Sequence, residues 1–191
     1  MRGMMALSLF LSIFFLSACS MFNNETILDI IQKKYETDDT VKSSVHSSDT
    51  DRVFIAKNKS INEVAESLEK AKKPKEISGK VDQKKVLVYD KYFVILTPDN
   101  KNASNTRIEV ATYGFVRDNF QPSFFDHLLS FYLLDKLLGV HDWAYRQGHR
   151  CYETGGCYQG YNQSGGHYKG PGSKPLFRGS SFRGGGPDAG K

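Results

Sequence analysis

Four short runs of apolar and β-branched residues, each bounded by polar residues, predict strands in the central part of the chain. The runs lie at residues 52–56, 85–89, 92–97 and 107–112. Asp90-Lys91 separates the second run from the third, and residues 98–105, which are rich in Asn and Asp, separate the third from the fourth. Since connections this short and polar are typical of turns, the last three runs predict an antiparallel meander.

Two segments before and within this region have the period of a helix. Ser60 and Glu63 form a capping box ahead of residues 61–72, and Pro74 follows the segment. Its apolar stripe consists of Ile61, Val64, Ala65, Leu68 and Ala71. A shorter helix is expected at residues 25–35, with Asn24 as its cap. Residues 36–51 are polar and have no period, so we expect a loop there.

A third predicted helix, at residues 124–138, is apolar on nearly every side. Ser123 is its expected cap and Gly139 its expected end. A helix without a polar face needs cover on more than one side. It is therefore interpreted either as a central core helix or as an exposed face that docks on a partner or a membrane.

These elements predict a small single-domain α+β fold with the order β-α-β-β-β-α at residues 52–143. We expect one helix to cross between the first strand and the meander, and the second to pack on the same sheet. Residues 19–51 would form a lipidated N-terminus, a short helix and a polar linker.

Composition changes after residue 143. Residues 144–191 contain seven Lys and Arg against two Asp and Glu, and 13 of the 17 glycines lie between Gly148 and Gly190. Because this segment has almost no aliphatic residues to bury, it predicts a disordered, basic Gly/Tyr/Arg-rich tail. Its candidate contacts to anionic polymer are Arg146, Arg150, Lys169, Lys174, Arg178 and Arg183.

The first residues have the layout of a bacterial lipoprotein signal. Arg2 precedes an apolar run, and Leu16-Ser17-Ala18 places small residues directly before Cys19. This order predicts a signal peptide at residues 1–18 and a diacylglycerol group on the Cys19 thiol. An ordinary signal peptide and an uncleaved membrane anchor are the alternatives, although the apolar run is short for a span.

This location affects how the tail and its cysteines are interpreted. Outside the cytoplasm, the basic tail would contact anionic envelope polymer, lipid or a membrane protein, or have no partner; nucleic acid is the least favoured. Cys151 and Cys157 favour a disulfide in an oxidising compartment. The alternative is a metal site formed by His149, Cys151, Cys157 and His167, although the Cys-x5-Cys spacing is not typical of zinc sites.

The sequence contains no phosphate loop, zinc-protease motif or nucleophile elbow. Asp126-His127 and His141-Asp142 are the pairs that an acid–base scheme would use, but such pairs are more often structural. We therefore expect no enzyme activity, no catalytic residues and no cofactor. An envelope enzyme or metal-binding protein using the C-terminal His/Cys cluster is the competing hypothesis.

Several short motifs together resemble an uncharacterised family of bacterial lipoproteins, domain-of-unknown-function family 4247. The motifs are Ile61-Asn62-Glu63 with Val64-Ala65-Glu66, Lys73-Pro74, Val86-Leu87-Val88-Tyr89, Ile108-Glu109-Val110, Val116-Arg117-Asp118-Asn119-Phe120 and Pro122-Ser123-Phe124. The resemblance covers roughly residues 27–145. It implies a lipid-anchored envelope protein with one domain, and it implies no activity. We therefore expect a binding or accessory protein at the extracytoplasmic face of the cell membrane.

Overall fold

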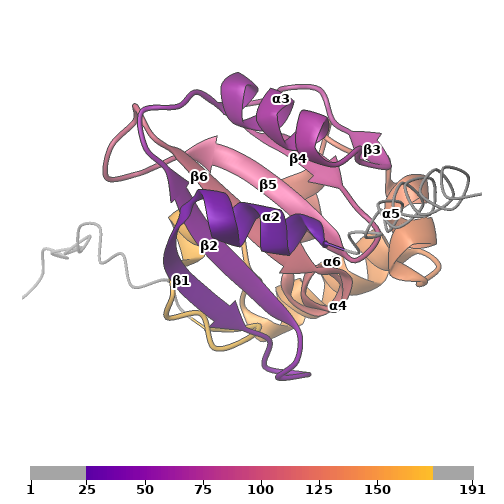
Figure 1. Ribbon diagram of the computed structural model, residues 1–191. Helices are drawn as coiled ribbons and strands as arrows, with labels where there is room; N and C mark the ends of the chain where they lie inside the picture. The colour runs from indigo at the N-terminus through magenta and orange to yellow at the C-terminus, as the bar shows by residue number, and fades with distance from the viewer. Residues whose placement is uncertain (1–24, 174–191) are drawn as a thin grey trace, which may run out of the picture.

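The computed structural model describes residues 25–173, which form one six-stranded antiparallel sheet with helices on both faces (Figure 1). The strand order is β1-β2-β6-β5-β4-β3. The strands are β1 (Glu36–Lys42), β2 (Thr50–Ala56), β3 (Glu76–Ile77), β4 (Lys85–Val88), β5 (Tyr92–Pro98) and β6 (Thr106–Thr112). The small α+β domain and the predicted meander β4-β5-β6 are confirmed, including the turn at Asp90-Lys91.

One face of the sheet is covered by α2 (Ile27–Lys34) and α3 (Ile61–Ala71) (Figure 1). The capping box of Ser60 and Glu63 is present at the start of α3, and Val64, Ala65 and Leu68 are buried against the sheet. The cap of α2 differs from the prediction: Thr26 caps this helix in a second capping box with Asp29, whereas Asn24 lies outside the described residues.

The opposite face is covered by the second half of the chain. Its elements are α4 (Tyr113–Asn119), the 3-10 turn η2 (Pro122–Phe125), α5 (Phe131–Leu138), α6 (Trp143–Thr154) and α7 (Tyr161–Ser164). The helices of the second half therefore pack on the same sheet as α3, as expected, but on its other face. The sheet is the middle layer of three. Within residues 25–173, no helix has the length and apolar character needed to cross a membrane.

The prediction of a loop at residues 36–51 is wrong for its first half, which forms strand β1. This strand pairs with β2 from Glu36↔Ile55 to Lys42↔Thr50, at the edge of the sheet. Val41 is its one fully buried side chain. The sequence did not reveal this strand because most of its side chains face solvent, so apolar and polar residues do not alternate along it. The charged side chains of an edge strand also discourage pairing with other chains.

The predicted helix at residues 124–138 is also wrong as a single element. The chain forms η2, turns with His127 in the left-handed region (φ 61°), and begins a new helix, α5, after Ser130. The Ser130 hydroxyl accepts a hydrogen bond from the Leu133 amide at 3.3 Å, as in an N-cap. Because the chain turns between η2 and α5, Phe125 of η2 and Leu134 of α5 can both be fully buried in the same core cluster.

The largest correction concerns the predicted disordered tail at residues 144–191, because residues 144–173 are folded onto the domain. They include most of α6 and all of α7, and Tyr158 and Tyr168 are buried in the main core cluster. Aromatic side chains supply here the buried area that the scarce aliphatic residues do not. Residues 174–191 lie outside the described residues, as do residues 1–24 with the signal peptide and Cys19.

Candidate functional site

Two carboxylic acids lie side by side in the middle of the sheet, and we call Asp51 and Glu109 the carboxyl pair. Asp51 is on β2 and Glu109 on the neighbouring strand β6, where the register pairs Asp51 with Ala111 and Val53 with Glu109. The two acids are therefore diagonal neighbours on one face. Both are 0% exposed. Such burial is rare for carboxyl groups, which makes the carboxyl pair the most unusual chemical feature of the fold.

Burial raises the pKa of both members of the carboxyl pair, and the mutual repulsion of the two groups raises that of Asp51 further. The Tyr158 hydroxyl donates to Asp51 Oδ2 at 2.9 Å and also lies 3.3 Å from Glu109 Oε2. The Tyr161 amide donates to Glu109 Oε2 at 2.9 Å. Because two adjacent buried carboxylates cannot both be charged cheaply, the carboxyl pair retains a proton.

A buried arginine forms a second polar group on the same face of the sheet. The Arg107 guanidinium is 2.8 Å from Asp38 and also pairs with Asp99, and it lies 4.6 Å from the centre of the Tyr161 ring. The Tyr161 hydroxyl donates to Asp39 Oδ2 at 2.7 Å. Residues 157–173, which we call the C-terminal segment, therefore cover a row of buried charges with aromatic side chains.

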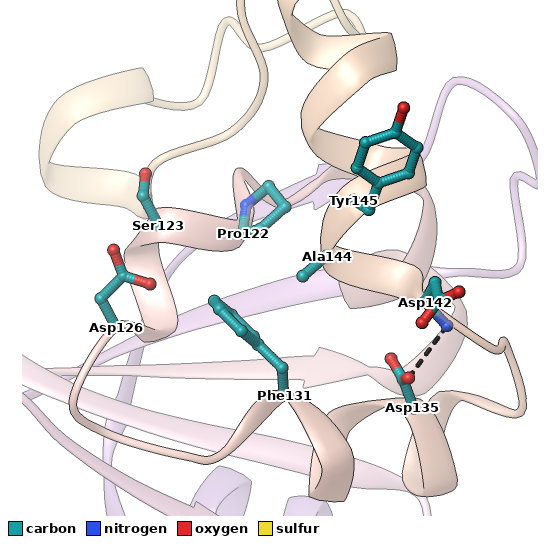
Figure 2. A pocket seen from close by; sticks show the side chains of 8 residues that line it. All are labelled: Pro122, Ser123, Asp126, Phe131, Asp135, Asp142, Ala144 and Tyr145. Carbon is teal, nitrogen blue, oxygen red and sulfur yellow. Dashed lines mark hydrogen bonds between the residues drawn. The ribbon is translucent and has the colours of Figure 1, made fainter.

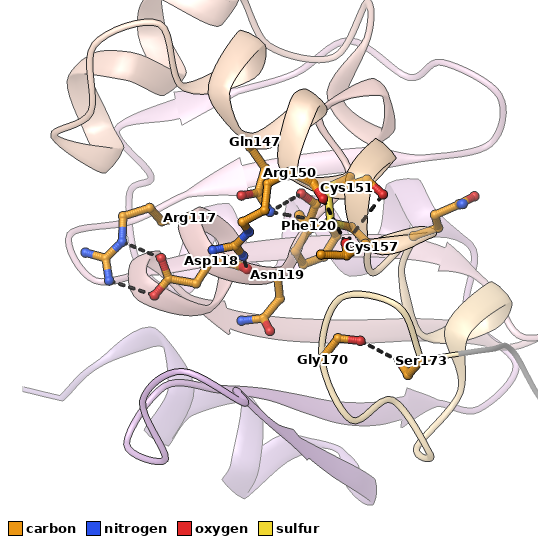
Figure 3. The surroundings of a disulfide bond; sticks show 12 residues. Arg117, Asp118, Asn119, Phe120, Gln147, Arg150, Cys151, Cys157, Gly170 and Ser173 are labelled. Carbon is orange, nitrogen blue, oxygen red and sulfur yellow. Dashed lines mark hydrogen bonds and ion pairs between the residues drawn. A yellow bond between two sulfur atoms is a disulfide. The ribbon is translucent and has the colours of Figure 1, made fainter.

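A disulfide bond fastens this segment to α6 (Figure 3). It joins Cys151 to Cys157, whose Cα atoms are 5.2 Å apart, as predicted for an oxidising compartment. Beside it, Gln147 Nε2 donates to the carbonyl of Phe120 at 3.0 Å. The disulfide and this hydrogen bond hold the start of the C-terminal segment next to α4 and η2.

A pocket of about 410 Å³ lies beside the carboxyl pair, and we call it the polar pocket. It is formed by the β3–β4 loop, the end of β5, β6, η2 and the C-terminal segment. Its lining residues are Asp82, Lys84, Thr97, Pro98, Asn100, Glu109, Phe124, Gln159, Gly160, Asn162 and Gln163.

A second hollow, of about 560 Å³, lies between η2, α5 and α6, and we call it the α5–α6 groove. Figure 2 shows the Phe131 ring between η2 and α6, with Asp126, Asp135 and Asp142 around the groove. Both oxygens of Asp135 accept backbone hydrogen bonds at 2.9 Å, from Asp142 and Trp143, so this acid also caps the start of α6.

Large aromatic side chains are exposed on α5 and α6, and two of them, Phe131 and Tyr145, line this groove. Phe131 is 42% exposed, Tyr145 76%, Tyr132 80% and Tyr152 89%. All four belong to α5 or α6. Scattered apolar residues on a surface need no explanation, but four aromatic rings on two packed helices form a candidate interaction surface.

The basic residues predicted to contact anionic polymer do not form one group. Arg146 and Lys169 are exposed. Arg150 is not available in the same way, because its guanidinium donates to the carbonyl of Asp118 and so holds α6 against α4 (Figure 3). Lys174, Arg178 and Arg183 lie outside the described residues.

The alternative metal site at His149, Cys151, Cys157 and His167 is not assembled. The disulfide uses both thiols, and His149 contacts Glu153 at 3.2 Å on the surface of α6. Within residues 25–173 no group of His, Cys, Asp and Glu is arranged to hold a metal ion. The disulfide also leaves no free Cys151 thiol for the nucleophile of the competing enzyme hypothesis.

Sequence reasoning missed the carboxyl pair, although a signal for it exists. In residues 107–112 the polar side chains alternate with apolar ones, a pattern usually found when one face of a strand meets water. Here Arg107 and Glu109 occupy that polar face and are buried by the C-terminal segment. The sequence does not indicate that the aromatic residues of the C-terminal segment, Tyr158 and Tyr161, cover this polar face.

The chain was compared with protein families, curated proteins and solved structures. The model of the family described as "Domain of unknown function (DUF4247)" matches residues 12–191. No curated protein matches the chain, and no solved structure matches it. Because the family model matches nearly the whole chain, including the carboxyl pair, the disulfide and the α5–α6 groove, this protein belongs to the DUF4247 family.

Proposed function

We propose that this protein is a lipid-anchored cell-envelope protein of a non-enzymatic, binding or accessory type. It would be attached through Cys19 to the extracytoplasmic face of the cell membrane. The order Leu16-Ser17-Ala18-Cys19 supports the anchor. The disulfide between Cys151 and Cys157 supports the location independently, because such bonds persist mainly in oxidising compartments.

The exposed aromatic surface of α5 and α6 is the observation that carries the binding role. Tyr132, Tyr145 and Tyr152 are each more than three-quarters exposed, and Phe131 and Tyr145 line the α5–α6 groove. Tyrosine and phenylalanine are enriched at protein interfaces because they bury a large area with few rotatable bonds.

The charges of the α5–α6 groove indicate the chemistry of its partner. Asp126, Asp135 and Asp142 line it, and no Lys or Arg does. An apolar floor with an acidic rim fits a protein segment that carries both apolar and basic side chains. A membrane protein with such a segment outside the bilayer is the proposed partner.

The basic residues have a separate role in this proposal. Arg146 and Lys169 are exposed, and Lys174, Arg178 and Arg183 follow in the part of the chain outside residues 25–173. These cations would contact anionic envelope polymer by charge neutralisation, which does not depend on sequence. Arg150 is not among these polymer contacts, because its guanidinium donates to the Asp118 carbonyl.

A non-enzymatic role is supported by the position of the most perturbed ionisable groups. Catalytic acids and bases must reach a substrate proton within hydrogen-bonding distance. Although Glu109 borders the polar pocket, Asp51 and Glu109 are both 0% exposed, and the Tyr158 hydroxyl lies against both of them. Their perturbed pKa values are therefore explained by their place in the core.

The proposal is tested by photo-crosslinking in intact cells from a benzoyl-phenylalanine introduced at Tyr145. The matched control carries the same group at Glu66, an exposed residue of α3 on the opposite face of the sheet. We expect a discrete adduct from position 145 alone, joined to a peptide containing Lys or Arg and lost when Phe131→Ala is added. Equal adducts from both positions, or an adduct unaffected by Phe131→Ala, would contradict the proposed surface.

A further inference from the structure

Five lysines lie close together at one end of the sheet, and we call them the lysine patch. Four of them are at the end of α3, where residues 70–75 read KAKKPK, and the fifth is in the turn between β4 and β5. Lys72 and Lys91 line one hollow of about 340 Å³, so these two segments are neighbours in space. Lys72 is half-buried, and the other four lysines are exposed. The members of the lysine patch are Lys70, Lys72, Lys73, Lys75 and Lys91.

The acids nearby leave the lysine patch with an excess of positive charge. Asp90 lies 2.8 Å from Lys75 and neutralises it, whereas Glu69 pairs with Lys85, which is outside the patch. The other four lysines form no ion pair in the described part of the chain, and Glu76 is the one further acid in this stretch of sequence. The described chain as a whole has 21 Lys and Arg against 20 Asp and Glu, so the excess is local.

The first described residues of the chain lie against the lysine patch. The Lys72 ammonium donates to the Glu25 carbonyl at 2.9 Å, and Glu25 lines the same hollow as Lys91. The Glu25 carboxylate itself pairs with Lys33 at 2.5 Å, so it does not cancel the charge of the patch. Figure 1 shows the start of α2, the end of α3 and the start of β5 at the same end of the sheet.

The position of Cys19 limits how far this end of the domain can be from a membrane. Cys19 precedes Glu25 by six residues. Because an extended chain spans about 3.5 Å per residue, the Cα atoms of these two residues are at most about 20 Å apart. A lipid on Cys19 would therefore keep the lysine patch close to the headgroups.

We propose that the lysine patch docks on anionic lipid headgroups when Cys19 carries its lipid. This inference rests on the proposed lipid anchor, and it names the surface that the anchored domain presents to the membrane. Each lysine near an anionic surface strengthens attraction to it by about fivefold in affinity. The anchor makes docking intramolecular, so a weak attraction is sufficient. Lipid is favoured over wall polymer because the chain from Cys19 fixes the distance to the headgroups, whereas a polymer has no such fixed distance.

Docking through the lysine patch also sets the orientation of the domain. Lys91 precedes β5 and Lys101 follows it, so these two lysines lie at opposite ends of a strand about 20 Å long. Lys101 is exposed, and in the docked domain it points away from the membrane. The two lysines therefore give opposite predictions in an accessibility experiment.

The test couples residues 19–191, which contain the whole described domain, to vesicles through Cys19. The disulfide uses the other two cysteines of the chain, so Cys19 alone reacts with a maleimide lipid. The vesicles contain phosphatidylcholine with or without phosphatidylglycerol, and acetylation by a neutral succinimidyl ester is followed by mass spectrometry. We expect phosphatidylglycerol to slow acetylation of Lys73 and Lys91 by about fivefold and to leave Lys101 unchanged. High salt should remove the difference.

Two double variants connect this protection to the lysine patch. Lys73→Glu with Lys91→Glu should abolish the protection of Lys70 by phosphatidylglycerol. Lys59→Glu with Lys101→Glu makes the same change in net charge at the far end of the sheet and should leave Lys70 protected. A thermal melt of each variant shows that the fold is retained.

Four outcomes would overturn the proposal. They are equal acetylation on both kinds of vesicle, equal protection of Lys101, and protection of Lys70 that survives Lys73→Glu with Lys91→Glu. The fourth is protection by a soluble polyglycerol phosphate but not by phosphatidylglycerol, which would assign the patch to wall polymer. Because Cys19 is coupled chemically, the result does not depend on whether cells lipidate it. An unmodified Cys19 in cell membranes would instead contradict the proposed function.

Discussion

The carboxyl pair predicts an unusual dependence of stability on pH, which Asp51→Asn should remove. Burial raises the pKa of Asp51 and Glu109 in the folded state above the values of about 3.9 and 4.3 expected in an unfolded chain. The folded protein therefore binds more protons than the unfolded chain above about pH 4. The stability from this pair is fully present below that pH and is lost as the pH rises through the raised values.

The magnitude follows from the number of protons retained. One extra proton in the folded state lowers the free energy of unfolding by about 1.4 kcal/mol for each pH unit. Between pH 5 and pH 7 this amounts to about 2.7 kcal/mol if the carboxyl pair keeps one proton throughout. Acids with a lowered pKa, such as Glu63 and Asp99, have the opposite effect, but they act below about pH 4.

Urea unfolding followed by the fluorescence of Trp143 provides the assay. Trp143 is the sole tryptophan of the chain and is buried. We expect Asp51→Asn to flatten the fall in stability between pH 5 and pH 7, because its amide can donate to Glu109 without a titrating proton. Asp126→Asn, at an exposed acid, should keep the wild-type slope. A wild-type stability that is constant or rises over this range would refute the reasoning.

Three further outcomes are expected. Cys151→Ser should lower the free energy of unfolding by about 2 kcal/mol, the chain-entropy value for the short loop closed by Cys157, as measured against the wild type without reductant. Gly172→Ala should cost about 1–3 kcal/mol, because Gly172 has a φ of 85° and a Cβ there would overlap the Thr154 backbone carbonyl oxygen; an unchanged urea midpoint would contradict this packing. Deleting residues 174–191 should change stability by less than about 0.5 kcal/mol, since the buried aromatic residues precede them, and a thermal melt checks this.

Sequence pattern predicted the elements whose burial is carried by aliphatic side chains. Strands β2, β4, β5 and β6 and helix α3 each have apolar residues at the period of their secondary structure. Strand β1 was missed because an edge strand with one buried side chain has no such period. Helix α6 was missed because glycine and polar residues surround its buried positions Trp143, Gln147 and Cys151. These positions have helical spacing, but Gln147 is not a usual core residue.

The candidate sites were predictable to different degrees. The pairing of Cys151 with Cys157 was favoured by the expected compartment, with a metal site as the alternative that the disulfide in the structure replaces. The carboxyl pair did not, because its burial depends on Tyr158, which follows Asp51 by more than a hundred residues. Likewise, Arg150 was indistinguishable in sequence from the exposed Arg146, and only the contact with the Asp118 carbonyl separates their roles.

The central claim, a lipid-anchored protein in an oxidising compartment, is tested most directly by mass spectrometry of the protein from its own cell membranes. A proteolytic digest without reductant preserves the disulfide, so one experiment detects both the lipid on Cys19 and the Cys151–Cys157 bond. We predict an N-terminal peptide that begins at Cys19 and carries a diacylglycerol group, together with a disulfide-linked Cys151–Cys157 peptide. A chain that retains residues 1–18, or an unmodified Cys19 thiol with free Cys151 and Cys157, would contradict the account.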